Sequence, residues 1–377
     1  LRITPAEETL DLAKSIFPSN YVGGITTVDE PPAAIYEETN QLINSRISTE
    51  LPQEVRNKCQ TIIEYGVKHG VFSDALIKGR FLNCGPTLDN PVAPEWKGEN
   101  QRRHTHNNVK IIRDFLEPLL KIGYVVPSKA TRFSNLHVVR QTRLLPDGTK
   151  EHTHKLTIDL REVNANSDTM KSAIPLPLEG AKSLCSNGNR YFMAFDLMKA
   201  YFQQPCSRAH SEGRSFYAPG MGVFRFNDRI GLGDASAPGA FSIAMDNFLG
   251  PIRPAGYVNY FDDVSVGTVN AEDLPNLLKI LVDRSIEVGA TFKLSSLQIG
   301  NSFTHFAGLR CDDSGIHAPA LQLGKLASLE IPSSKTELRS YMGVLNYLDK
   351  FLPPNVVLAL KECVSPFLKK DQPESFD

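Results

Sequence analysis

The 377-residue chain carries 41 Lys and Arg residues against 42 Asp and Glu residues, so its net charge is −1, and 41% of its residues are hydrophobic. These values are typical of a folded globular protein with room for two or three packed subdomains. No run approaches ~18 uninterrupted apolar residues, which excludes a transmembrane helix. The six cysteines lack any Cys-x-x-Cys spacing, which argues against a zinc knuckle and a disulfide framework.

Charge is unevenly distributed along the chain. Residues 1–95 contain 8 Lys and Arg against 13 Asp and Glu, a balance of −5. Residues 97–161 contain 13 against 6, a balance of +7. A basic stretch after an acidic one is typical of a local phosphate-contacting surface, although a solvated basic surface explains it equally well.

The N-terminal quarter of the chain predicts an extended arm followed by helices. Residues 1–35 are rich in Pro, Gly and acidic residues, and a helical pattern begins at Ala34. A second helix is expected after Leu51, because Pro52 suits a helix start and apolar residues then recur at steps of three and four. The irregular, Pro-containing stretch 81–96 predicts a domain boundary.

The basic stretch predicts an amphipathic helix followed by a β-hairpin. Apolar residues recur at helical steps from Asn108 to Gly123, and glycine suits the left-handed position that ends a helix. Residues 136–140 and 155–160 alternate as strands, and the Pro-Asp-Gly sequence at 146–148 is a strong turn signal between them.

The second half of the chain contains two acidic positions inside apolar strands. One is Asp196, at the end of a buried-type strand, and the other is the pair Asp262-Asp263, which interrupts an aromatic and β-branched run and predicts a hairpin turn. A glycine-rich loop, 231–239, opens a helix between them. Helices are also predicted for 273–289 and from Ser334, where Ser334-x-x-Glu337 forms a capping box.

Two adjacent carboxylates in an apolar run are costly to bury unpaired. A divalent cation removes that cost, since hard cations bind carboxylate oxygens. An ordinary acidic turn is the simpler interpretation of Asp262-Asp263 alone. Asp196 lies 66 residues before Asp262, so only a folded sheet can join them. Together with a glycine loop, carboxylates from separate strands are what two-metal phosphoryl transfer needs.

These runs resemble a known family. Residues 195–203, the glycine loop and Tyr260–Asp263 resemble motifs A, B and C of the reverse transcriptases of Gypsy-type LTR retrotransposons and retroviruses. Other matching stretches are 158–164 for a fingers element, 174–177 for the following Pro-x-Pro segment, 306–308 for the primer grip, 338–347 for the thumb helix and 366–370 for the start of the connection. The resemblance extends from about residue 97 to the end.

The resemblance implies an α+β, right-hand polymerase fold with fingers, an antiparallel palm sheet and a helical thumb, plus a mostly helical N-terminal extension. The expected segments are 1–95 for the extension, 96–180 for the fingers with the first palm entry, 181–310 for the palm with a returning fingers segment, and 311–377 for the thumb and the start of the connection. We expect no RNase H domain, because the chain stops where that domain begins in the family.

The function implied is RNA-directed and DNA-directed DNA synthesis from a primer, by two-metal nucleotidyl transfer with Mg²⁺, or with Mn²⁺ in its place. The catalytic carboxylates implied are Asp196, Asp262 and Asp263, and these three residues together with Leu197 are the metal ligands implied. The partners implied are an RNA template, a DNA or RNA primer and dNTPs, with no membrane. A homodimer or other products of a retroelement polyprotein are also expected partners, in cytoplasmic particles.

The resemblance also assigns substrate contacts. The expected nucleotide-binding residues are Lys155, Lys199, Ala200, Tyr201 and Gly231. Tyr201 matches an aromatic gate that leaves no room for a ribose 2′-hydroxyl, although a tyrosine by itself is more often a core residue. The expected primer and template contacts are Phe261, Phe306, Gly308, Lys335 and Arg339.

The sequence departs from the family pattern in the glycine loop and before the primer grip. The loop is two residues longer, and Asp234 places a negative charge that we expect close to the nucleotide. Ser295-Ser296 stands where a lysine pair is common, and Lys293 precedes it. These departures favour an alternative function, a catalytically silent scaffold or RNA-binding relative. An RNA-templated RNA polymerase is a third alternative, which Tyr201 argues against.

Overall fold

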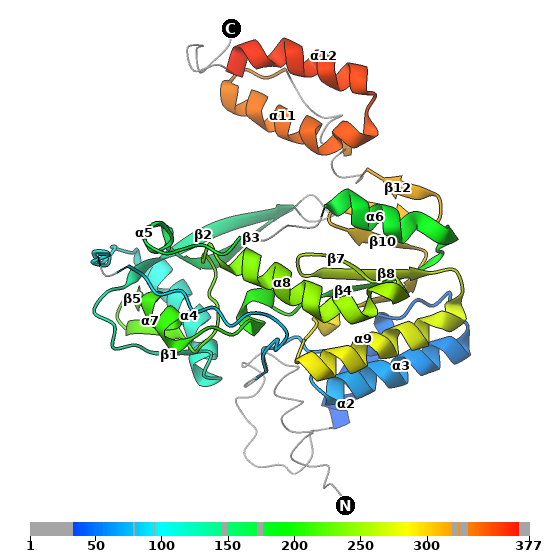
Figure 1. Ribbon diagram of the computed structural model, residues 1–377, viewed down its shortest axis with the longest axis horizontal. Coiled ribbons are helices and arrows are strands. Elements are labelled where there is room, and N and C mark those ends of the chain that lie inside the picture. The colour runs from blue at the N-terminus through cyan, green and yellow to red at the C-terminus, as the bar shows by residue number, and fades with distance from the viewer. Residues whose placement is uncertain are drawn as a thin grey trace, which may run out of the picture.

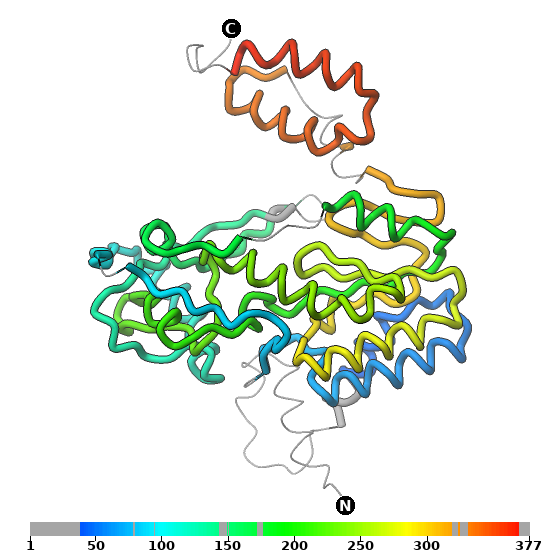
Figure 2. Tube along the Cα trace, in the orientation of Figure 1, coloured from blue at the N-terminus to red at the C-terminus, as the bar shows by residue number. Residues whose placement is uncertain are grey.

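The computed structural model describes residues 33–77, 80–93, 95–144, 149–171, 176–318, 323–324 and 331–368. Within them the chain forms three β-sheets that are covered by helices, with a further pair of helices at the C-terminal end (Figure 1). The trace in Figure 2 follows the same order from the N-terminal helices to that C-terminal pair. No helix in this part of the chain is long and apolar enough to cross a bilayer.

The central sheet has four antiparallel strands in the order β7-β8-β4-β9. Its strands are β4 (Tyr191–Asp196), β7 (Val258–Tyr260), β8 (Asp263–Thr268) and β9 (Gln298–Asn301). Side chains alternate between the two faces of a strand, so Met193 and Phe195 enter the main core while Asp196 points to the other face. Val264 and Val266 of β8 also enter the main core. Asp263 therefore lies on the same face of the sheet as Asp196.

Helices from the N-terminal part and from the middle of the sequence share the core beneath this sheet. They are α2 (Ala33–Ser45), α3 (Gln53–Lys68), α8 (Ala237–Leu249) and α9 (Leu274–Val288). Figure 1 shows α3 running beside α9. Residues from Ile43 to Leu82 belong to the same buried cluster as the central strands, so the predicted N-terminal extension is not a separate packing unit. The spacing of apolar residues in the sequence predicted the buried face of α3, but it did not predict that this face packs against α9.

The second sheet has five strands in the order β1-β6-β5-β2-β3. Its strands are β1 (Val125–Pro127), β2 (Ser134–Leu144), β3 (Lys150–Ile158), β5 (Phe216–Ala218) and β6 (Gly222–Phe226). The predicted hairpin is present as β2 and β3, and its 146–148 turn lies outside the described residues. Helix α4 (His106–Lys121) packs on it and is followed by Gly123 at φ 74°, as predicted.

Short elements connect the two sheets. They are α5 (Arg161–Ala165), the 3-10 helix η2 (Ala200–Gln203) and α7 (Arg208–Gly213). The predicted Pro-x-Pro segment lies only partly in the described residues, and its second proline begins α6 (Pro177–Cys185). Helix α6 covers the third sheet, whose strands are β10 (Phe303–Phe306), β11 (Leu309–Asp312) and β12 (Gly315–His317).

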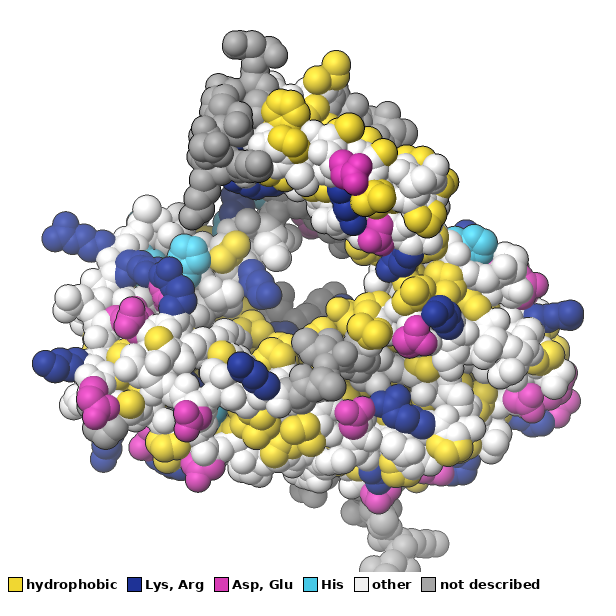
Figure 3. Space-filling view, turned by 45° about the horizontal axis from the view of Figure 1, so that its top comes forward, with side chains coloured by type: hydrophobic (Ala, Val, Ile, Leu, Met, Phe, Trp, Pro, Cys, Tyr) yellow, Lys and Arg dark blue, Asp and Glu magenta, His cyan; other side chains and the backbone are white. Residues whose placement is uncertain are grey.

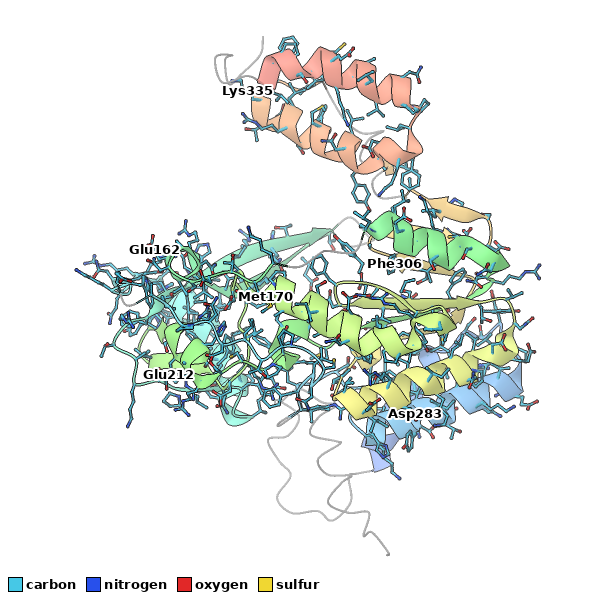
Figure 4. The ribbon with its side chains drawn as sticks, in the orientation of Figure 1. Glu162, Met170, Glu212, Asp283, Phe306 and Lys335 are labelled. Carbon is cyan, nitrogen blue, oxygen red and sulfur yellow. The ribbon has the colours of Figure 1, made fainter. Side chains whose placement is uncertain are left out.

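The C-terminal pair consists of α11 (Lys335–Leu348) and α12 (Pro354–Val364), which stand apart from the sheets in Figure 1. The predicted cap is present in altered form. The Ser334 Oγ accepts from the Glu337 N–H at 3.3 Å, but the Glu337 carboxylate accepts from the Ser333 N–H at 2.8 Å. Lys335, labelled at one end of α11 in Figure 4, is fully buried in this structure, and its role as a duplex contact stays a prediction.

Candidate active site

The three predicted carboxylates meet at one edge of the central sheet. Asp196 is the last residue of β4 and lies directly opposite Asp263, the first residue of β8. Asp262 occupies the turn between β7 and β8. One carboxylate oxygen from each of the three lies within 4.8 Å of the others. Antiparallel pairing therefore closes the gap in sequence that separates Asp196 from the pair.

Backbone hydrogen bonds fix the ends of these strands. The Asp262 carbonyl accepts from the Leu197 N–H at 3.1 Å, and the Asp196 carbonyl accepts from the Lys293 N–H at 2.8 Å. Phe261 in the turn has φ 51°, a left-handed conformation that is strained for a residue with a side chain. The turn is therefore held by its surroundings rather than by local preference.

A buried amide supports that turn, and sequence reasoning missed it. Asn259 is buried, and its Nδ2 donates to the Phe261 carbonyl at 3.4 Å. Its Oδ1 accepts from Arg253 Nη2 at 3.1 Å, and the same guanidinium donates to Asp246 at 2.7 Å. A polar residue inside an apolar strand was the available signal, because a buried amide needs partners.

The carboxylates repel one another. Burial and the neighbouring charges of Asp262 and Asp196 raise the pKa of Asp263 to about 6. Burial and the Asp262 charge also raise the pKa of Asp196, while Lys293 opposes that shift. Burial raises the pKa of Asp262. Three half-buried carboxylates with raised pKa values have an excess of negative charge at neutral pH.

A divalent cation fits this donor set. The three side chains offer carboxylate oxygens that surround one point. Mg²⁺ and Mn²⁺ prefer such hard oxygen ligands. A bound cation would also offset the repulsion that raises the pKa values of the three carboxylates. The Leu197 side chain has no ligand atom, so only its backbone carbonyl could bind a cation.

A cavity of about 650 Å³ opens above the carboxylates. It lies between the central sheet, the second sheet and the turn between β10 and β11. Its walls are formed by Phe115, Lys155, Lys199, Ala200, Tyr201, Phe202, Leu232, Phe241, Tyr260, Phe261, Asp262, Asp263, Ala307 and Gly308. Figure 3 shows an opening through the molecule below the C-terminal helices.

Most of the predicted nucleotide contacts line this cavity. Lys155 and Lys199 bring two ammonium groups to it from different elements. Tyr201 stands edge-on to Phe241, with ring centroids 5.6 Å apart, so its ring is held at the cavity wall. Gly231 is not among the lining residues, because it packs against Phe226, and the next residue, Leu232, lines the cavity instead.

The predicted primer contacts divide into two groups. Phe261 and Gly308 line the cavity, and Arg339 is exposed on α11. Phe306 is fully buried and lies beside α6 (Figure 4), where its ring packs so closely that a Cβ on Gly180 would lie 2.5 Å from it. The Phe306 ring thus shapes the packing under the β10–β11 turn, and its role in positioning the primer strand stays a prediction.

Asp234 does not carry a free charge toward the cavity, contrary to the expectation from sequence. It is buried, ion-paired to Arg214 and 2.9 Å from His210 Nε2. Burial by itself would raise its pKa, but the hydrogen bond with His210 and the charge of Arg214 outweigh burial and lower it. Asn164 holds the loop on both sides of Asp234, by donating to the Gly233 carbonyl at 3.0 Å and accepting from the Ala235 N–H at 3.1 Å.

The serines that replace the lysine pair are part of a different contact. Ser295 donates from its N–H and its hydroxyl to the Asp74 carboxylate, at 3.0 and 2.7 Å. Asp74 comes from the segment after α3, which sequence reasoning placed outside the catalytic region. Lys293 directly precedes the short 3-10 helix Leu294–Ser296 that contains Ser295, and its charge acts on Asp196.

The family described as "Reverse transcriptase (RNA-dependent DNA polymerase)" matches residues 140–311, which contain all three carboxylates. Residues 140–311 thus match a reverse transcriptase domain. The chain is similar to the Retrovirus-related Pol polyprotein from transposon 297 of Drosophila melanogaster, with 22% identity over 279 residues, which are 72% of the chain and 24% of the relative. The Tf2-3 polyprotein of Schizosaccharomyces pombe is 23% identical over 263 residues, 70% of the chain and 19% of the relative. The chain thus spans about a quarter or less of these relatives.

Solved structures share the fold of this chain. The foamy viral protease-reverse transcriptase dRH in complex with double-stranded DNA superposes with a TM-score of 0.69 and 16% identity, over 91% of this chain and 57% of that chain. The foamy viral protease-reverse transcriptase in complex with an RNA/DNA hybrid also gives a TM-score of 0.69 and 16% identity, over 91% of this chain and 44% of that chain. The expected α+β polymerase fold is confirmed.

Proposed function

We propose that this chain is an RNA-directed and DNA-directed DNA polymerase that extends a primer on a template by two-metal nucleotidyl transfer. The observation that carries the proposal is the meeting of Asp196, Asp262 and Asp263 within 4.8 Å, since two of them, Asp262 and Asp263, line a cavity that Tyr201 also lines. Bound Mg²⁺ ions would supply charge neutralisation and activation of the primer 3′-hydroxyl.

The chain's own residues divide the remaining work. The three carboxylates hold the cations at the sheet edge, and the Leu197 carbonyl is proposed as a further ligand. The ammonium groups of Lys155 and Lys199 neutralise the triphosphate, while the backbone at Ala200 lies beside it. Phe261 and the turn at Gly308 bound the space for the primer end. Tyr201 blocks the position of a 2′-hydroxyl, which selects dNTPs over rNTPs.

Template and primer are proposed to lie in the opening between the second sheet and α11. Exposed Arg339 is placed to contact the duplex backbone, a sequence-independent contact that weakens with salt. The proposal is supported by the nucleic-acid complexes of the foamy viral protein, which has the same fold. We propose that the chain acts in cytoplasmic retroelement particles. Its protein partner there is a second copy of the chain or another product of a retroelement polyprotein.

The catalytically silent alternative is less favoured by the site. A scaffold has no need for three carboxylates that repel one another, since replacing any of them would relieve the repulsion. The longer glycine loop no longer supports that alternative strongly, because the charge of Asp234 is neutralised by Arg214 away from the carboxylates.

Primer extension tests the proposal. The chain is mixed with a labelled DNA primer on an RNA template, and in parallel on a DNA template, with Mg²⁺ and dNTPs. We expect extension by the wild type, loss by more than about 1,000-fold in Asp262→Asn, and wild-type extension in Asp283→Asn, whose exposed carboxylate pairs with Lys279 on α9. A folded wild type that fails to extend, where a known reverse transcriptase succeeds, contradicts the proposal.

A further inference from the structure

The turn between β10 and β11 reaches the edge of the active-site cavity. Phe306 pairs with Leu309 around a two-residue loop, Ala307-Gly308, whose φ values are 49° and 79°. Two successive left-handed residues are the geometry of a tight hairpin turn, and alanine adopts it at a cost. Both loop residues line the cavity that contains Asp262 and Asp263.

Helix α11 contacts this turn through a single hydroxyl. Tyr347 lies 39 residues further along the chain, and its Oη donates to the Gly308 carbonyl at 2.9 Å. The contact is close, since a Cβ built on Gly308 would lie 2.5 Å from that oxygen and 3.7 Å from the next atom of the ring. The hydroxyl therefore occupies the space that a side chain at position 308 would need.

An apolar contact lies beside the polar one. Phe351 follows α11 and packs against the buried cluster that includes Phe306 and Leu309, the residues on either side of the turn. Helix α11 and the residue Phe351 after it thus contact the third sheet at two neighbouring places. One contact is a hydrogen bond and the other is apolar packing. A hydrogen bond has a preferred direction, so the hydroxyl defines the angle of the helix more narrowly than the aromatic packing does.

We propose that Tyr347 is a positioning residue for the primer strand, because its hydroxyl ties α11 to the turn that borders the cavity. The inference rests on the proposed polymerase function. The hydroxyl holds the C-terminal helices at one distance from the three carboxylates, so a duplex that lies between them meets a preformed site. Loss of the bond lets the helix pair leave that position, and the duplex must then supply the ordering free energy.

The first test uses Tyr347→Phe, which keeps the ring and removes the donor. We expect the Kd for a primer–template duplex to rise about fivefold, the factor that one net hydrogen bond supplies. The number of nucleotides added per binding event falls, while the single-turnover rate of the first addition at saturating duplex and dNTP stays at the wild-type value. Ser340→Ala, which removes an exposed hydroxyl from the same helix, is the control and keeps wild-type values throughout. Unchanged duplex affinity and run length in Tyr347→Phe overturn the proposal.

A second test measures the contact without any enzymatic activity. Gly308→Ala places a methyl group against the Tyr347 hydroxyl, and Gly308→Ala with Tyr347→Phe removes that hydroxyl. The backbone strain at position 308 is common to both backgrounds and cancels in a double-mutant cycle. We expect Gly308→Ala to lower the Tm less in the Tyr347→Phe background than in the wild type. Additive effects overturn the positioning role, whereas a wild type that neither binds nor extends a primer overturns the proposed function.

Discussion

At the residue scale, the carboxylates are held in a state that favours a proton or a cation. The pKa of Asp263 rises to about 6, because of burial and the adjacent charges of Asp262 and Asp196. A carboxyl group whose pKa is higher in the folded state stabilises the fold below its unfolded pKa, and this stability is lost as the pH rises through about 6. The metal-free protein is therefore less stable at neutral pH than its packing would allow.

Asp263→Asn tests this directly. In EDTA at about pH 8, we expect the free energy of unfolding of the variant to exceed that of the wild type, by on the order of 2 kcal/mol after allowance for solvent screening. The difference should vanish near pH 3, below the ordinary pKa of 3.8, where the carboxyl is protonated in both the folded and the unfolded state. Denaturant titrations at both pH values measure it. A gain that is equal at both values contradicts the electrostatic origin, and Asp283→Asn should show no such dependence.

Tyr201 carries a separate prediction about substrate choice. Its ring borders the cavity and is held edge-on by Phe241. Tyr201→Ala should lower the ratio of kcat/KM for dNTP to that for rNTP by on the order of 10- to 100-fold, because the steric block is lost. Tyr201→Phe keeps the ring and should keep the ratio. Single-nucleotide incorporation assays measure both, and equal ratios in wild type and Tyr201→Ala contradict a gating role.

At the scale of elements, a buried ion pair holds the glycine loop. Asp234 lies inside the protein with Arg214 and His210, and Asn164 binds the loop on either side of it. The two additional residues of the loop are thus absorbed by packing against α7 and α5, and Leu232 is presented to the cavity. The greater length of the loop changes how the loop is anchored to α5 and α7 more than it changes the space that is open to a nucleotide.

Arg214→Met leaves Asp234 buried without its cation. We expect a loss of about 3–5 kcal/mol in the free energy of unfolding, since a buried charge is left unpaired. Arg208→Met is the matched control, because it breaks an exposed pair with Glu212 at the same helix and should cost less than about 1 kcal/mol. Urea denaturation measures both. Equal losses in the two variants contradict the account.

At the scale of the whole molecule, residues far from the catalytic motifs complete the palm. Helix α3 packs on α9, and the segment after it contributes Phe72 to the core and Asp74 to the Ser295 contact. The strands that carry Asp196 and Asp263 therefore depend on the first quarter of the chain for one of their covering layers. A catalytic unit that began at the basic stretch would leave that face of the core exposed to water.

Ile63→Ala examines this dependence from a position on α3 that is fully buried. We expect a loss of about 2–5 kcal/mol in the free energy of unfolding through the cavity created beneath the central sheet. Ile62→Ala, at a half-buried neighbour, should cost less. Thermal or chemical unfolding followed by a palm-specific signal measures the effect. Unfolding of α3 without loss of the central sheet contradicts a shared core.

The sequence by itself determined the strands, the helices and the three carboxylates, because hydrophobic periodicity and motif order are local properties. The resemblance of those motifs to a known family also predicted Lys155, Lys199 and Tyr201 as nucleotide contacts, and these three residues line the cavity. Tertiary structure alone decided which side chains are exposed: Phe306 and Lys335 are buried, and Asp234 is paired. Tertiary structure also brings together segments that are distant in sequence. Tyr347 contacts Gly308, and α3 shares a core with the central strands. The burial and the ion pairing of a side chain depend on which residues pack against it. These residues come from distant parts of the chain, so a local sequence pattern does not predict them.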